Sequence, residues 1–137
     1  MAVDATVGDL RTRGAVPEGV DAVCRTVDDP VMADARSGSY GGGVIRVLYP
    51  LKRTTGQEAY WHDITAHEAG HAWDARYLTT TQRARYAQVR GLPTFNGEDY
   101  ADTFAALAGG ATYLGYIGSP PPPEQVAAIC AERLVPC

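Results

Sequence analysis

One stretch of the chain, residues 57–78, constrains the possible folds more than any other. It contains no proline, and a stripe of positions within it follows the i, i+3, i+4, i+7, i+8 spacing of a buried helix face. The residues in this stripe are Ile64, His67, Glu68, His71 and Ala72. Histidines four positions apart lie one above the other on a helix, so both rings reach the same region. We therefore expect a long helix with two histidines and a glutamate on its core-facing side.

The two histidines and the glutamate form the pattern H-E-x-x-H. Both imidazoles can bind one metal ion, and Glu68 points toward the same region, close enough to act on a water molecule held there. Zinc hydrolases use this arrangement with the glutamate as general base. We expect Zn²⁺ as the cofactor, His67 and His71 as two of its ligands, and Glu68 as the catalytic base. Since a catalytic zinc ion normally has three protein ligands and a water, a third ligand is required.

A later helix supplies two acidic candidates for the metal site. This helix is expected to begin after Asn96, a good capping residue, and it carries Glu98 and Asp102 four positions apart. The 26 residues between His71 and Glu98 (98 − 71 − 1) allow a helical hairpin that returns across the first helix. We expect Glu98 to be the third ligand and Asp102 to accept a hydrogen bond from a ligand histidine. Asp99 is the competing ligand, and we expect it to face solvent as a capping residue.

These motifs together resemble those of the gluzincins, the zinc peptidases typified by thermolysin. The segment 98–104, Glu-Asp-Tyr-Ala-Asp-Thr-Phe, is similar to a segment of the anthrax lethal factor catalytic domain and of small bacterial peptidase-like proteins. In those families the first glutamate binds zinc, which corresponds to Glu98 here. The resemblance covers residues 44–108. It implies a zinc metallopeptidase, an endopeptidase acting on a peptide or protein substrate, with an α+β, zincin-like fold that is mostly helical with a small sheet.

The sequence departs from the lethal factor pattern in the residue that helps the transition state. That family has a tyrosine a few residues before the third ligand, and the matching place here, near Gly91, has none. Four tyrosines are candidates for the missing donor, and the sequence does not distinguish among them: Tyr86, Tyr100, Tyr113 and Tyr116. The alternative function is therefore a zinc-binding, catalytically inactive peptidase-like binding module.

Length and charge limit the partners that this chain is expected to have. Its 137 residues suit one domain, so we expect a single catalytic domain over 1–137. The formal net charge of -4 gives no electrostatic support to nucleic-acid or anionic-membrane binding, and no apolar run is long enough to span a membrane. We expect a monomer that binds neither nucleic acid nor membrane. The polar residues after Met1 do not form a signal peptide, so the chain is either cytosolic or a mature secreted domain.

The three cysteines favour the secreted alternative. Cys130 and Cys137 enclose a short loop, and a disulfide between them would hold the C-terminal segment and indicate an oxidising compartment. Cys24 would then be unpaired, although a disulfide between Cys24 and either of the other two remains an alternative.

The remaining elements are expected from local patterns. The β-branched segment 44–49 predicts a strand, either an edge strand that pairs with an extended substrate or a core strand. Pro17 is expected to begin a short helix to about Thr26, and the glycine-rich residues 33–43 are expected to form a loop. Further helices are expected after a capping box at Thr79–Gln82, ending at Gly91, and over 124–134.

Overall fold

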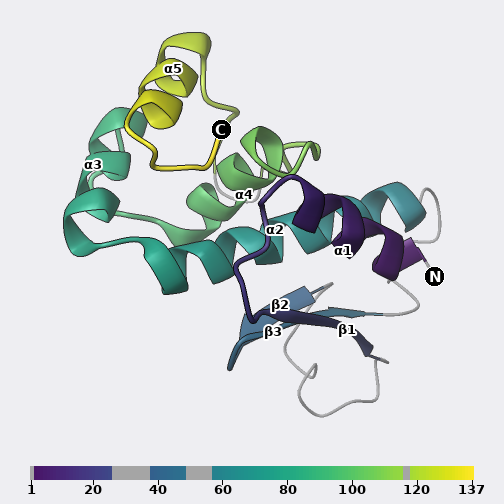
Figure 1. Ribbon diagram of the computed structural model, residues 1–137. Coiled ribbons are helices and arrows are strands. Elements are labelled where there is room, and N and C mark those ends of the chain that lie inside the picture. The colour runs from purple at the N-terminus through teal and green to yellow at the C-terminus, as the bar shows by residue number, and fades with distance from the viewer. Residues whose placement is uncertain (1, 26–37, 49–56, 116–117) are drawn as a thin grey trace.

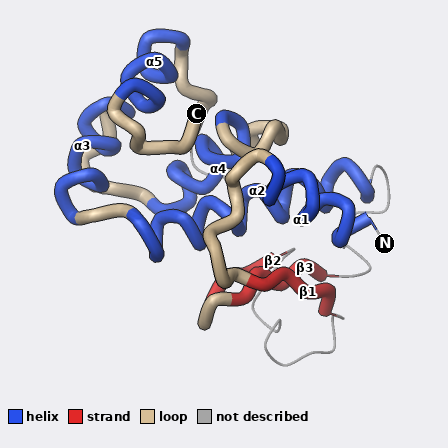
Figure 2. The backbone as a smooth tube through the Cα atoms, viewed as in Figure 1, coloured by secondary structure: helices blue, strands red, loops and turns tan. Residues whose placement is uncertain are grey.

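The computed structural model describes residues 2–25, 38–48, 57–115 and 118–137. In these parts the chain has an α+β architecture with five helices and one three-stranded sheet, as predicted (Figures 1 and 2). In chain order the elements are α1 (Ala2–Thr12), β1 (Asp21–Arg25), β2 (Gly38–Gly41), β3 (Val44–Leu48), α2 (Gln57–Tyr77), α3 (Thr80–Arg90), α4 (Gly97–Leu107) and α5 (Pro123–Ala131).

The strand predicted from segment 44–49 is confirmed, and it occupies the centre of the sheet. The strand order is β1-β3-β2, with β1 parallel and β2 antiparallel to β3. Gly42 and Gly43 join β2 to β3 with φ values of 59° and 78°, the left-handed conformation that a tight two-residue hairpin turn favours. Because β3 has a neighbour on each side, the core-strand alternative is confirmed and the edge-strand alternative is wrong.

Two other predictions for the N-terminal part are also wrong. The helix expected from Pro17 is replaced by a turn with Gly19 at φ 79° and then by β1. Residues 38–41, expected within a loop, form β2. In both cases pairing with β3 supplies the backbone hydrogen bonds, and this long-range partner outweighs the weak local preference of each segment.

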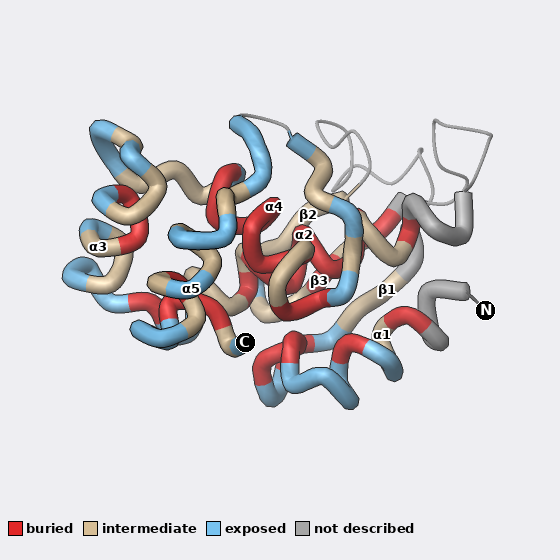
Figure 3. Tube along the Cα trace, turned by 90° about the horizontal axis from the view of Figure 1, so that it is seen from above, coloured by how far each residue is buried: buried red, intermediate tan, exposed pale blue. Residues whose placement is uncertain are grey.

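Helix α2 is the central element, and it lies between the sheet and α4 (Figure 1). Its sheet-facing side packs on Ile45 and Val47, which are fully buried. On the other side Gly70 meets α4 so closely that a Cβ at this position would lie 2.8 Å from the Cα of Ala101. Buried positions accordingly gather along α2 and α4 (Figure 3).

The C-terminal elements pack on the far side of α4. The capping box at Thr79 is present at the start of α3, and Gly91 ends that helix in the left-handed conformation. The predicted disulfide joins Cys130, in the last turn of α5, to Cys137. The Tyr100 hydroxyl donates a hydrogen bond to the carbonyl of Leu134, so this closed loop is attached to α4. No helix in the described parts of the chain combines the length and hydropathy that crossing a membrane requires.

Candidate metal centre

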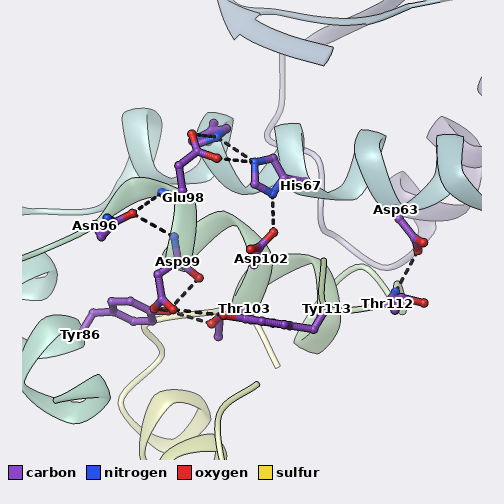
Figure 4. A network of polar contacts seen from close by, with 11 residues as sticks. Asp63, His67, Tyr86, Asn96, Glu98, Asp99, Asp102, Thr103, Thr112 and Tyr113 are labelled. Carbon is purple, nitrogen blue, oxygen red and sulfur yellow. Dashed lines mark hydrogen bonds and ion pairs between the residues drawn. The ribbon is translucent and has the colours of Figure 1, made fainter. Parts of the chain in front are cut away.

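Three side chains from α2 and α4 converge on one point. The Nε2 atoms of His67 and His71 are 3.1 Å apart, as expected for histidines one turn apart on α2. Glu98 comes from the first turn of α4, where the Asn96 side chain accepts hydrogen bonds from the amides of residues 98 and 99. Its two carboxylate oxygens lie 3.0 Å from His67 Nε2 and 3.2 Å from His71 Nε2 (Figure 4).

These distances fit a shared metal ion. Two nitrogen ligands at about 2.05 Å from a tetrahedral zinc ion are about 3.3 Å apart. The 3.1 Å between the two Nε2 atoms is within about 0.2 Å of that value, and one ligand atom from each of His67, His71 and Glu98 lies within 4.8 Å of the others. Two imidazoles and a carboxylate are also the donor types that zinc prefers. The group of His67, His71 and Glu98 can therefore hold a metal ion, with Glu98 on the exposed side of the site.

Asp102 orients one of the two imidazoles. Its Oδ1 lies 2.8 Å from Nδ1 of His67, and the Asp102 side chain is fully buried. A carboxylate on Nδ1 holds a proton there, so Nε2 is the ring nitrogen that faces Glu98 (Figure 4). Asp102 thus has the geometry that its expected role requires. Glu98, one turn earlier on α4, is about half exposed.

Without a metal ion the cluster carries closely coupled charges. Burial lowers the pKa of His67, but hydrogen bonds to Asp102 and Glu98 outweigh it and raise that pKa to about 9. Burial and the neighbouring charge of His67 lower the pKa of His71. The hydrogen bond from His67 holds the pKa of Glu98 below its usual value. One imidazole is thus protonated and the other neutral near pH 7, and the proton on His67 occupies the place that a metal ion would take.

Glu68 lies beside this cluster but does not join it. Its side chain is buried, and burial raises its pKa to about 7. No described residue donates a hydrogen bond to the Glu68 carboxylate. In the described parts of the chain every fully enclosed polar side-chain atom has a hydrogen-bond partner. The carboxylate therefore reaches solvent, and its charge is poorly stabilised by the protein. These are the properties of a group that can accept a proton from a nearby water molecule.

The prediction that Asp99 faces solvent is wrong. Asp99 is 1% exposed and makes two contacts with the Arg90 guanidinium, at 3.0 and 2.9 Å. Arg90 also donates hydrogen bonds to Gln125 and to the carbonyl of Ser119. Asp99 therefore points away from the ligand cluster and joins α4 to α3 and to the segment before α5. The presence of Arg90 nine residues before Asp99 was the only sign of this pair in the sequence. It does not show toward which side of α4 the Asp99 side chain points.

Three of the four tyrosines considered as transition-state donors are bonded elsewhere. The hydroxyls of Tyr86 and Tyr113 both donate to Asp99, at 2.7 and 3.2 Å. Tyr100 is fully buried and donates to Leu134 at 2.7 Å. The fourth candidate, Tyr116, lies outside the described residues.

Sequence reasoning did not identify β2 as part of the site. A Cβ at Gly38 would lie 3.1 Å from Cγ of Glu68 and 2.8 Å from Cγ2 of Ile64. The edge strand therefore passes directly over the glutamate of the H-E-x-x-H motif. The glycines around residue 40 were visible in the sequence, but they indicated a flexible loop rather than a close approach.

No family model, curated protein or solved structure matches this chain. The functional assignment therefore depends on the geometry of the site.

Proposed function

We propose that this chain is a zinc-dependent metallopeptidase with a zincin-like arrangement of helices and sheet. One observation carries the proposal. Two imidazole nitrogens 3.1 Å apart face one carboxylate, next to a buried glutamate that accepts no hydrogen bond from the described residues. His67, His71 and Glu98 hold the ion, Asp102 orients His67, and Glu68 is the general base. This ligand set is the one that the resemblance to the gluzincins implies.

The chemistry divides between the ion and the protein. Zinc supplies a Lewis acid that polarises a peptide carbonyl and lowers the pKa of a water molecule. Glu68 accepts a proton from the attacking water as the C–O bond forms, and it donates that proton to the amine nitrogen as the C–N bond breaks. A carboxylate with a raised pKa suits both steps, since it can take up and release a proton near neutral pH.

The sheet offers a place for an extended peptide substrate. In the described part of the chain β2 is an outer strand, paired on one side with β3, and it passes over Glu68. A peptide that added to the free side of such a strand would be held by backbone hydrogen bonds, which are independent of its sequence. This placement supports a peptide or protein substrate cleaved within its chain.

Chelator-dependent cleavage is the direct experiment. The protein is loaded with one equivalent of zinc, incubated with a mixed peptide library, and compared with a sample treated with a chelator and then dialysed. We expect internal cleavage by the zinc-loaded sample alone, restored when zinc is added back. Zinc binding without cleavage of any peptide would contradict the peptidase proposal.

A zinc-binding, inactive peptidase-like module is the second candidate. The bonding of Tyr86, Tyr100 and Tyr113 to other groups favours it, because none of the three is free to assist a transition state. The same cleavage experiment separates the two candidates.

The proposed setting is extracellular, with the protein acting as a monomer. The Cys130–Cys137 disulfide supports an oxidising compartment, since such bonds are rare in the cytosol. A cytoplasmic location is the alternative. The net charge of -4 gives no support to a nucleic-acid or anionic-membrane partner.

A further inference from the structure

A catalytic metallopeptidase site requires a hydrogen-bond donor for the carbonyl oxygen, which gains negative charge in the transition state. The hydroxyls of Tyr86, Tyr100 and Tyr113 would each have to give up a hydrogen bond within the protein to provide it. Two other described tyrosines, Tyr40 and Tyr77, make no hydrogen bond through their hydroxyls. Tyr77 is the last residue of α2, and its ring packs on Trp73 with the ring centroids 4.6 Å apart. Tyr40 lies on β2, the strand that passes over Glu68.

The register of the sheet fixes the side of β2 from which Tyr40 projects. Tyr40 pairs with Ile45 and Gly38 pairs with Val47. Residues that face each other across two strands project to the same side of the sheet, and Ile45 and Val47 are both fully buried on the α2 side. The half-buried Tyr40 ring accordingly packs against the core, while its hydroxyl reaches solvent.

The direction of β2 determines which turn of α2 lies level with Tyr40. Figure 1 shows β2 and α2 running in the same direction. Gly38 lies over Ile64 and Glu68. Two residues of strand advance about 6.6 Å, which is equivalent to about four residues of helix. Tyr40 is therefore level with the helical turn of α2 that follows Glu68 and contains His71.

We propose that Tyr40 is the transition-state donor of this site, its hydroxyl donating a hydrogen bond to the carbonyl oxygen of the scissile peptide bond. This assignment rests on the proposed peptidase function. The Tyr40 proton stays on its oxygen throughout, because the proton from water goes to Glu68 and then to the leaving amine. One residue of β2 would bind the substrate backbone, and the neighbouring Tyr40 would donate to the substrate carbonyl. The same strand would therefore align the substrate and the donor.

The test compares Tyr40→Phe with the wild type and with Tyr77→Phe, all loaded with one equivalent of zinc. Tyr77→Phe removes a hydroxyl that is equally free of partners but lies at the end of α2. For Tyr40→Phe we expect kcat to fall about a hundredfold with little change in KM. Zinc affinity and Tm should stay at the wild-type values, since the ring is kept. Tyr77→Phe should retain full kcat.

A second measurement does not depend on turnover. A phosphonamidate dipeptide carries a tetrahedral, negatively charged P–O group that resembles the transition state, so its Kd reports the donor directly. We expect Tyr40→Phe to weaken this Kd at least tenfold and Tyr77→Phe to leave it unchanged. Equal Kd or equal kcat for the wild type and Tyr40→Phe would overturn the Tyr40 assignment but not the proposed peptidase function. A zinc-loaded wild type that neither cleaves peptides nor binds the phosphonamidate would overturn the proposed function, and the Tyr40 assignment with it.

Discussion

His67 and Asp102 form a buried pair, with Nδ1 of the imidazole 2.8 Å from Oδ1 of the carboxylate. The pair joins α2 to α4 at the point where both helices contribute to the ligand cluster. The carboxylate holds a proton on Nδ1 of the ring, so we expect the metal affinity of the proposed site to depend on a residue outside the ligand set.

Replacing Asp102 should therefore weaken metal binding. We expect Asp102→Asn to lower zinc affinity about tenfold and Asp102→Ala up to about a hundredfold, because the imidazole loses its anionic partner. Competition with a chromogenic chelator measures both values. Asp63→Asn is the matched control, since this acid on α2 accepts a hydrogen bond from the Thr112 amide, outside the ligand cluster. An unchanged zinc affinity in Asp102→Ala would exclude the orienting role.

Metal binding should weaken as the pH falls. The pKa of His67 is raised from 6.5 to about 9 in the metal-free protein, so below pH 9 a zinc ion must displace a proton from this ring. We expect the apparent affinity to drop by up to about tenfold for each pH unit between 9 and 7. Titration calorimetry in two buffers of different ionisation enthalpy measures the proton released. No proton release at pH 7.5 would contradict the expected protonation of His67.

Gly70→Ala should destabilise the fold and disturb the metal site together. The added Cβ would lie 2.8 Å from the Ala101 Cα, so α4 has to move, at a cost of about 1–3 kcal/mol in the free energy of unfolding. The displacement also carries Glu98 and Asp102 away from the histidines. Gly8→Ala in α1 is the control, because a Cβ there meets nothing within 4 Å. Urea unfolding and zinc competition on both variants measure the two effects, and a Gly70→Ala protein as stable as the wild type would show that the helices do not approach this closely.

The Arg90–Asp99 pair should contribute strongly to stability. Arg90→Ala leaves the Asp99 carboxylate buried without its cation, so we expect a loss of about 3 kcal/mol in the free energy of unfolding. The exposed Arg85–Glu132 pair provides the comparison, and Arg85→Ala should cost far less, because solvent screens this pair. Similar losses in the two variants, measured by urea unfolding, would contradict the buried position of Asp99.

The parts of this protein that local rules govern could be predicted from the sequence. Helix periodicity alone brings His67 and His71 together, and a capping residue at Asn96 fixes the phase of α4 and thus the positions of Glu98 and Asp102. The elements whose structure depends on pairing with residues far away in the sequence could not be predicted. β1 and β2 exist because β3 lies between them, and neither segment has a strong strand preference of its own.

The sequence also did not show in which direction individual side chains point. Asp99 and Glu98 are adjacent acids in the first turn of one helix, and only the position of Arg90 on α3 decides that Asp99 turns inward. In the same way, Gly38 and Tyr40 resembled loop residues until the hairpin placed them over α2. These positions belong to the site because the fold brings their strand close to α2, and their residue types alone did not indicate it.

The variant Glu68→Gln separates metal binding from catalysis, because it removes the proposed base and leaves His67, His71 and Glu98 in place. Zinc content and peptide cleavage are measured on the same preparation of this variant and of the wild type. We predict one equivalent of zinc in both proteins and cleavage reduced at least a thousandfold in the variant, because glutamine cannot accept the proton of water. Cleavage at the wild-type rate by the zinc-loaded variant would contradict the account.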